Sequence, residues 1–442
     1  MWRHEQVGAS QYKRIRQEMP GLGQHVLKYC QQSSRTGCEL ARGFALLLCL
    51  LLPWIPSWAE EESGASDVNE ESTPWLDRSN RFMDITRAPM TMLESNSPFF
   101  QKRDLYFFGR IEMDAAHFSS GVLSDDSGAI IRRFRAGLVG HFRWTENWSY
   151  KLEFDLTDSE NRLADAYFNW TPGNWGTIRI GNQKVAQTLS GSTSTLTVPF
   201  LERPLPVLAF TLQRRLGVGY ELHRPRWGLQ GTVFSRDINE QYGSEGYAIR
   251  TYYRGGSEES RIYHIGLSSL ILEGDHDAQF RARPESHLTN TRLVDTGVYT
   301  DVDSASAYGA EIAVIQGSYS VVGEYYRAGW DRIDESDPVF DGWYVQGARI
   351  FGGHRHSFEK GKFYRPEINN PKGAWEAVAR FSSVDLDSRG VRGGVEDNWT
   401  LGVNWYSPLH WRVMFNLIKV DADGPQGRQD PWITQARVQY YF

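Results

Sequence analysis

The sequence predicts an all-β fold, a 16-stranded antiparallel transmembrane β-barrel, and three observations carry this prediction. Apolar and polar residues alternate along short segments over most of the chain. Long and short connections between these segments also alternate. The last segment ends on an aromatic residue, as bacterial outer-membrane barrels commonly do.

The alternation is clearest in residues 131–156. In 131–144 one face is polar or small, made of Arg133, Arg135, Gly137, Val139, His141 and Arg143. The other face is apolar with an aromatic end, made of Phe134, Ala136, Leu138, Gly140, Phe142 and Trp144. We expect a polar turn at 145–147, after which 148–156 repeats the pattern. Because side chains of a strand alternate between its faces, this hairpin suits a soluble sandwich, whose apolar face meets a second sheet, or a barrel with a charged lumen.

The amino-terminal region predicts export. Residues 44–52 form an apolar run that is too short for a membrane-spanning helix of roughly 20 residues. It is followed by Ala59 and an acidic start, which predicts a signal peptide over residues 1–59. The lead is unusually long, so either the signal is extended or the true start lies downstream; the alternative is a buried helix of a soluble domain. All three cysteines, Cys30, Cys38 and Cys49, precede the predicted cut, which suits passage through an oxidising compartment.

Charge excludes one class of partner. Seven of the 48 Lys and Arg and three of the 54 Asp and Glu precede residue 60, so the remainder has a net charge of −10, with 41 basic and 51 acidic residues. Such an acidic chain argues against a nucleic-acid partner. Residues 60–100 are acidic and rich in Ser, Asn and Pro, and we expect a flexible segment there, followed by the barrel over 101–442.

The predicted strands are 105–118, 131–144, 148–156, 164–170, 177–184, 214–223, 227–235, 246–254, 261–270, 308–316, 318–328, 342–352, 374–384, 399–406, 411–420 and 432–442. Odd-numbered connections are generally long and even-numbered ones short. Outer-membrane barrels have this asymmetry, with long outer loops and short periplasmic turns. Residues 353–373 are an exception on the short side, so either the strand count slips there or one turn is enlarged. In the last strand Ala436, Val438, Tyr440 and Phe442 share a face, and aromatic residues at 13% suit interfacial girdles, which predicts the bacterial outer membrane and contact with its lipid.

No motif predicts an enzyme. A phosphate-binding Gly loop with Lys, a CxxC pair and Gly-x-Ser-x-Gly are all absent from the sequence. His354 and His356 lack a third ligand at useful spacing, so we interpret them as surface histidines. We therefore predict neither catalysis, a cofactor nor a metal. A hydrolase with a Ser/His pair in the barrel wall and a secreted, Trp-rich β-sandwich that binds glycans remain alternatives.

Arginines on the polar faces are the candidate functional residues. Strand alternation, which we call parity, places five of them on the lumenal face: Arg133, Arg135, Arg143, Arg179 and Arg215. Arg110 and Arg380 are further candidates. The same side carries five carboxylates, Glu112, Asp114, Glu153, Asp155 and Glu221. An ordinary solvated strand face, on which opposite charges alternate, is the alternative.

Several runs resemble the phosphate-selective porin O and P family. The most specific are 198–210, which contains Glu202-Arg203-Pro204-Leu205-Pro206, and the later Arg214-Arg215-Leu216-Gly217-Val218. Residues 131–138, 148–155, 373–376 and 400–406 are similar to the family in the same order, so the resemblance covers roughly 110–442.

The resemblance implies a 16-stranded, usually trimeric, outer-membrane channel whose third outer loop folds into the lumen. That loop corresponds to residues 185–213. Family selectivity rests on lumenal Arg and Lys, a role that the matched positions transfer to Arg133, Arg135, Arg203, Arg214 and Arg215. With Arg179 from the parity argument, these are the predicted binding residues for a small anion, phosphate or polyphosphate, that diffuses passively through the homotrimer. A general or sugar-selective porin of the same architecture is the alternative.

Overall fold

The computed structural model describes residues 91–92 and 105–442, apart from 120, 143–144, 158–162, 240–243, 275–276 and 334. The predicted signal peptide 1–59 and nearly all of the predicted flexible segment 60–100 lie outside the described residues.

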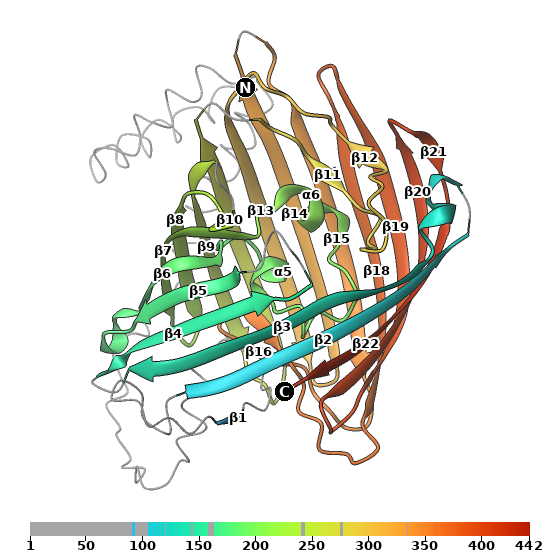
Figure 1. Cartoon of the computed structure of the whole chain (residues 1–442). Helices are drawn as coiled ribbons and strands as arrows, with labels where there is room; N and C mark the ends of the chain where they lie inside the picture. The colour runs from blue at the N-terminus through green and yellow to red at the C-terminus, as the bar shows by residue number, and fades with distance from the viewer. Residues whose placement is uncertain are drawn as a thin grey trace, which may run out of the picture. The chain divides into compact units, whose positions relative to one another are not determined.

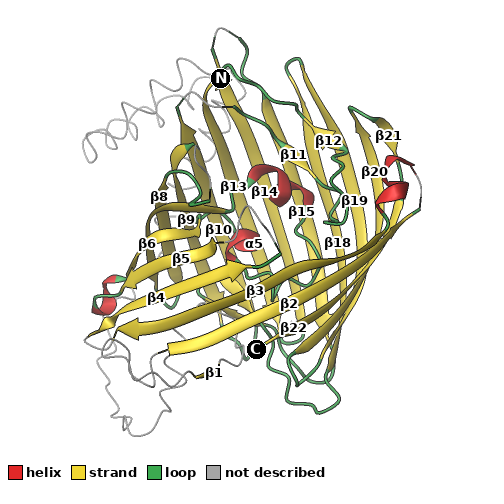
Figure 2. Ribbon diagram, viewed as in Figure 1, coloured by secondary structure: helices red, strands yellow, loops and turns green. Residues whose placement is uncertain are grey.

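One closed antiparallel sheet dominates the described chain (Figures 1 and 2). Its barrel strands are β2 (Leu105–Phe118), β3 (Gly128–Phe142), β4 (Thr145–Asp155), β5 (Leu163–Trp170), β6 (Thr177–Lys184), β7 (Arg214–His223), β8 (Trp227–Phe234), β9 (Glu245–Gly256), β10 (Ile262–Glu273), β13 (Val302–Gln316), β14 (Tyr319–Arg332), β15 (Val339–Ile350), β18 (Ala374–Ser388), β19 (Val391–Tyr406), β20 (Trp411–Gly424) and β22 (Trp432–Tyr441). The sheet has 18 strands, of which β1 (Thr91–Met92) and β21 (Gly427–Gln429) are short additions. The predicted 16-stranded barrel is therefore confirmed.

The aromatic carboxyl-terminal strand closes the ring. β22 pairs with β2 from Arg110↔Tyr441 to Phe118↔Ile433. Beyond the strand, the Phe442 amide donates to the Gly109 carbonyl at 3.0 Å, and the Gly109 amide donates to the Phe442 carbonyl at 2.9 Å. Because this closure pairs the first long strand with the last, the sheet has no free edge there.

The predicted facing of the first hairpin is also confirmed. Phe134 and Phe154 on the outer face are 38% and 40% exposed, whereas Arg133 and Glu153 on the inner face are buried. One boundary is wrong, because β4 begins at Thr145 and the predicted turn 145–147 belongs to the strand. Polar residues at alternate positions can extend the polar face of a strand as readily as they can form a turn. Predicted lumenal Arg143 lies outside the described residues.

Three connections carry structure of their own. Segment 185–213 contains α5 (Leu189–Ser192) and α6 (Leu205–Phe210), which lie within the ring of strands (Figure 1). Segment 277–301 contains β11 (Arg281–Ala282) and β12 (Val294–Asp295), and segment 353–373 contains β16 (Ser357–Glu359) and β17 (Lys362–Tyr364). The 353–373 exception is thus an enlarged turn with a small hairpin, and the strand count does not slip.

The remaining short elements lie in connections. They are the 3-10 helices η2 (Gly121–Asp126) and η3 (Gly173–Trp175). Among the described residues, no helix combines the length and the apolar character needed to cross a membrane.

Part of the barrel interior is a protein core. Large inward side chains of β14 and β15 are at most 3% exposed, and we call this surface the packed wall: Val322, Tyr326, Trp330, Phe340 and Tyr344. They belong to one cluster with residues of segment 185–213, namely Val185, Leu189, Leu205, Val207 and Phe210. On these strands apolar side chains therefore face inward as well, because an inserted segment excludes water from their inner face.

Candidate functional site

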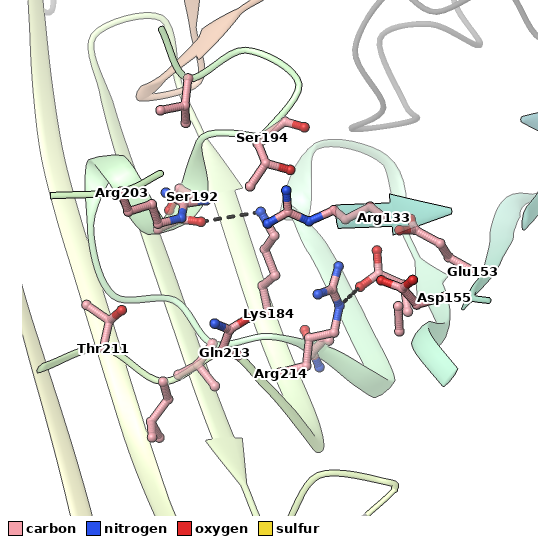
Figure 3. Close-up of a pocket in the computed structure, with 18 of the residues that line it drawn as sticks. Arg133, Glu153, Asp155, Lys184, Ser192, Ser194, Arg203, Thr211, Gln213 and Arg214 are labelled. Carbon is pink, nitrogen blue, oxygen red and sulfur yellow. Dashed lines mark hydrogen bonds and ion pairs between the residues drawn. The ribbon is translucent and has the colours of Figure 1, made fainter. Parts of the chain in front are cut away.

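A cavity of about 1020 Å³ lies between segment 185–213 and the inner face of β2–β8. Among the described residues that line it, 14 are Lys or Arg and six are Asp or Glu, although the chain as a whole is acidic. All six predicted binding residues line this cavity: Arg133, Arg135, Arg179, Arg203, Arg214 and Arg215. Figure 3 shows Arg133, Lys184, Arg203 and Arg214 directed toward the same space.

Most of these cations come from the barrel wall. We call the inward cations of β2–β7 the charged wall: Arg110, Arg132, Arg133, Arg135, Lys151, Arg179, Lys184, Arg214 and Arg215. Alternation along each strand brings the side chains inward, so neighbouring strands stack them side by side across the sheet.

Carboxylates on the same face pair with the arginines of β3. Arg133 donates to Glu112 at 2.5 Å, and Arg135 donates to Asp155 at 2.7 Å and to Glu153 at 3.1 Å. These paired carboxylates keep the arginine forks in fixed positions, since a charge-assisted hydrogen bond has strict geometry.

A β-bulge adds a cation that parity does not predict. The register of β2 and β3 shifts so that Glu112 faces Arg133 while Met113 faces Ile131. Arg132 is the extra residue, and a bulge of this kind redirects a side chain. Its guanidinium donates to Glu202 of segment 185–213 at 2.9 Å.

Cations of β4–β7 in the charged wall also pair with carboxylates. Arg179 donates to Glu221 at 3.0 Å. Asp165 accepts from both Lys151 and Arg214 at 2.5 Å. Asp165 is buried, whereas the side chain of Glu221 is 22% exposed.

Arg203 and Arg215 differ from the other predicted residues. Arg203 donates to the Ser190 hydroxyl at 3.0 Å and to the Thr193 carbonyl at 2.9 Å, and Arg215 donates to the Arg214 carbonyl at 2.8 Å. Within the described part of the chain, neither forms an ion pair with a carboxylate. Their charge is therefore the least compensated of the six.

The far side of segment 185–213 is tied to the opposite wall by its backbone. The Leu189 amide donates to Glu311 at 2.7 Å, and the Ser190 amide donates to Glu324 at 2.6 Å. Arg412 of β20 donates to the carbonyls of two further residues of the segment at 3.0–3.2 Å. These bonds satisfy backbone groups that would otherwise be buried without partners.

Glu202 stays ionised at the centre of this arrangement. Burial alone would raise the pKa of its carboxyl, but Arg132, Arg133 and Arg437 outweigh burial and hold that pKa well below its usual range. A permanent negative charge on Glu202 holds part of the segment against β3 and β22.

Sequence reasoning missed the cations of segment 277–301. Arg281, Arg283 and Arg292 line the cavity, and none of them makes an ion pair with a carboxylate among the described residues. The sequence signal was limited to three arginines within a long connection, and nothing local showed that this connection enters the barrel. The further candidates face inward as predicted, but Arg380 is 3% exposed and is covered by segment 185–213, whereas Arg110 lines the cavity.

The interpretation of His354 and His356 as surface histidines is wrong. His354 is 8% exposed, and its Nδ1 lies 3.0 Å from the Glu367 carbonyl. His356 lies with its side chain buried 3.8 Å from Glu376. In the described ranges no group of three His, Cys, Asp or Glu is arranged to hold a metal ion.

A family model and two known proteins match most of the chain. The family model described as "Phosphate-selective porin O and P" matches residues 107–442. An uncharacterized protein of Caulobacter vibrioides is 29% identical over 367 residues, which cover 76% of this chain and 73% of that protein. Porin O of Pseudomonas aeruginosa is 22% identical over 388 residues, covering 76% of this chain and 87% of Porin O.

A solved barrel is similar in fold. The structure of OmpT of Vibrio cholerae, an outer membrane protein in its trimer form, superposes with a TM-score of 0.50 at 13% identity. The match covers 76% of this chain and 99% of OmpT.

Proposed function

Because this chain belongs to the phosphate-selective porin O and P family, we propose that this porin of the bacterial outer membrane gives passive passage to small anions, phosphate or polyphosphate above all. The ions would cross the cavity between segment 185–213, which narrows the lumen, and the charged wall. We propose a channel rather than an enzyme.

The observation that carries this proposal is the positive net charge of the cavity lining. Its described lining has 14 cations against six carboxylates in a chain whose net charge is negative. A narrow, low-dielectric passage of one sign raises the local concentration of ions of the opposite sign. The preference for anions therefore comes from the lining and not from the total charge of the protein.

Arginine suits phosphate in particular. A guanidinium keeps its charge at any physiological pH and offers paired donors that match two phosphate oxygens. Sites spread along a pore replace the hydration of the ion in steps, and each must be weak enough to release it to the next. The carboxylates that pair with Arg133, Arg135 and Arg179 would weaken these sites, whereas Arg203 and Arg215 would bind anions more strongly.

The test compares unpaired with paired cations. Arg203→Gln with Arg215→Gln should lower the anion-to-cation permeability ratio, measured from reversal potentials in planar bilayers under a salt gradient. Arg135→Gln with Arg179→Gln removes the same number of charges from cations that pair with Asp155 and Glu221. This double variant is the matched control and should have the smaller effect. An unchanged reversal potential in the double variant would contradict the arginine role, and equal currents in phosphate and chloride would contradict phosphate preference.

The second candidate is a general or sugar-selective porin, which the paired charges of the wall favour. Glu112, Glu153, Asp155, Asp165 and Glu221 each contact a cation of the lumen. Swelling of proteoliposomes in neutral sugars, together with a permeability ratio near one, would support this candidate over the first.

We also propose that the barrel forms a homotrimer in lipid and that residues 1–59 are removed on export. The trimer form of OmpT, whose fold is similar, supports the assembly, and the outward apolar residues of the barrel wall suit lipid. Cross-linking in native membranes and sequencing of the mature amino terminus test these two points.

A further inference from the structure

Glu285 of segment 277–301 is a buried carboxylate that the proposed passage does not use. It is 0% exposed. Its Oε1 accepts from the Leu205 amide at 3.2 Å and from the Ser382 hydroxyl at 2.5 Å. Its Oε2 accepts from Thr400 at 3.2 Å and from Arg380. Four donors from segment 185–213, β18 and β19 thus meet on one carboxylate.

The backbone of Glu285 is held as firmly as its side chain. Its carbonyl accepts from Gln435 of β22 at 3.1 Å. Its φ is +50°, in the left-handed region that few residues other than glycine adopt. Such a conformation persists where the surrounding contacts over-determine it, and it is found preferentially at functional sites.

Arg380 extends the connection toward the cavity. One of its guanidinium nitrogens donates to Glu285 and another donates to the Glu202 carbonyl at 3.1 Å. The guanidinium also lies over the Phe200 ring, 4.1 Å from its centroid. The side chain of Glu202 in turn accepts from Arg132, so a continuous set of contacts runs from Glu285 to a cation that lines the cavity.

We propose that Glu285 is a positioning residue, which joins segments 185–213 and 277–301 to β18, β19 and β22 and thereby sets the width and charge of the passage. This inference rests on the proposed channel function. An ion site works only while its cations keep their spacing, because the Coulomb energy changes steeply over a few ångströms. Glu285 fixes that spacing without touching the ion.

If Glu285 only stabilised the fold, its removal would reduce the amount of folded barrel. The ladders that close the barrel join wall strands to one another. Among the described residues, segment 277–301 pairs only with itself, through β11–β12 and a bridge between Ala278 and Tyr299. Removal of the Glu285 carboxylate should therefore leave the barrel assembled while it loosens the contact between the two inserted segments and β18 and β19. The readout must be the current through the pore and not the amount of folded protein.

The first experiment records single channels of the full barrel in planar bilayers. Glu285→Ala should turn a steady conductance into frequent transitions between levels and lower the anion-to-cation permeability ratio by about twofold, as expected when lumenal cations move by a few ångströms. Glu285→Gln keeps acceptor oxygen but loses the charge opposite Arg380, and its noise should be intermediate. Folding is checked by heat-modifiable migration in electrophoresis.

Glu396→Ala is the matched control. Glu396 is equally buried on the inner face of β19, and its bonding partner among the described residues is Asn398 on the same strand. Among the described residues it makes no hydrogen bond to either inserted segment. Steady currents are expected for this variant, and noise equal to that of Glu285→Ala would overturn the proposal.

The outcomes separate the inference from the function on which it rests. If the unmodified protein passes no ions, the channel function fails. If the unmodified protein conducts but Glu285→Ala is equally steady and selective, the positioning role fails.

Discussion

The charged wall and the packed wall belong to the same sheet and follow the same alternation, yet their inner faces serve opposite purposes. On the charged wall, inward side chains such as Arg135 and Arg179 surround a cavity. On the packed wall, inward side chains such as Trp330 and Tyr344 are as buried as those of a soluble core. The inside of a barrel is thus neither a pore nor a core by nature, and what covers it decides.

Segment 185–213 creates the difference because its two sides are unlike. Its amides at Leu189 and Ser190 are bound by Glu311 and Glu324 on one side of the barrel. Its Glu202 and Arg203 side chains line the cavity on the other. Once the backbone donors are satisfied on one wall, the opposite wall remains available to ions and water.

The largest effect is expected when a large side chain of the packed wall is removed. Trp330 is 2% exposed and contacts the rings of Phe280, Tyr299 and Phe340 at centroid distances of 5.0–5.4 Å. Trp330→Ala should lower the free energy of unfolding by about 3–5 kcal/mol, because a large buried ring is lost and a cavity remains. Urea-induced unfolding in lipid vesicles measures this.

Trp175→Ala is the control for that measurement. Trp175 is 80% exposed in a short turn, so its removal should change the free energy of unfolding by less than about 0.5 kcal/mol. Equal losses for the two tryptophans would show that the interior of β14 is not a core.

An intermediate effect is expected when a carboxylate of the charged wall is removed. Asp165→Asn removes the carboxylate shared by Lys151 and Arg214. The anion-to-cation permeability ratio should rise about two- to fivefold, the change that corresponds to about 0.5–1 kcal/mol for a partly solvated charge. Reversal potentials of the variant and the unmodified protein provide the measurement.

The control for Asp165 is an ion pair away from the cavity. Asp301 lies 2.7 Å from Arg332, and Asp301→Asn should leave the permeability ratio unchanged. A ratio that falls in Asp165→Asn would mean that the carboxylate places the two cations and does more than cancel their charge.

The smallest expected effect depends on pH. Burial, reinforced by Arg132, Arg283 and Arg133 against the opposing charge of Glu202, lowers the pKa of His287 to about 3. A free histidine has a pKa of about 6.5, so the contribution of neutral His287 to the docking of segment 277–301 is complete above that pH. It is lost as the pH falls from about 6.5 toward 3.

Single-channel records at pH 7 and pH 4 test this point. The current should be noisier at pH 4, and His287→Asn should reduce the difference between the two pH values, because it cannot acquire the charge. A pH response of the same size in both proteins would assign it to other groups.

The sequence alone was sufficient for the wall of the barrel. Period-two alternation is a local property, so residues such as Phe134 and Arg135 could be assigned to opposite faces and most strand ends placed within about four residues. The starts of two strands were predicted wrongly: β13 begins at Val302 rather than at 308, and β19 begins at Val391 rather than at 399. The motif around Glu202 and Arg203 identified the family and the inserted loop. The six predicted arginines do line the cavity, and their role in binding stays a prediction.

Only the tertiary structure decided which inward residues meet ions. The bulge that brings Arg132 inward depends on the register with a partner strand. The covering of Arg380 and the entry of Arg283 into the lumen depend on segments that are distant in sequence. Alternation states which face a side chain occupies, but what lies opposite that face is set by non-local packing, and this separates the core from the passage.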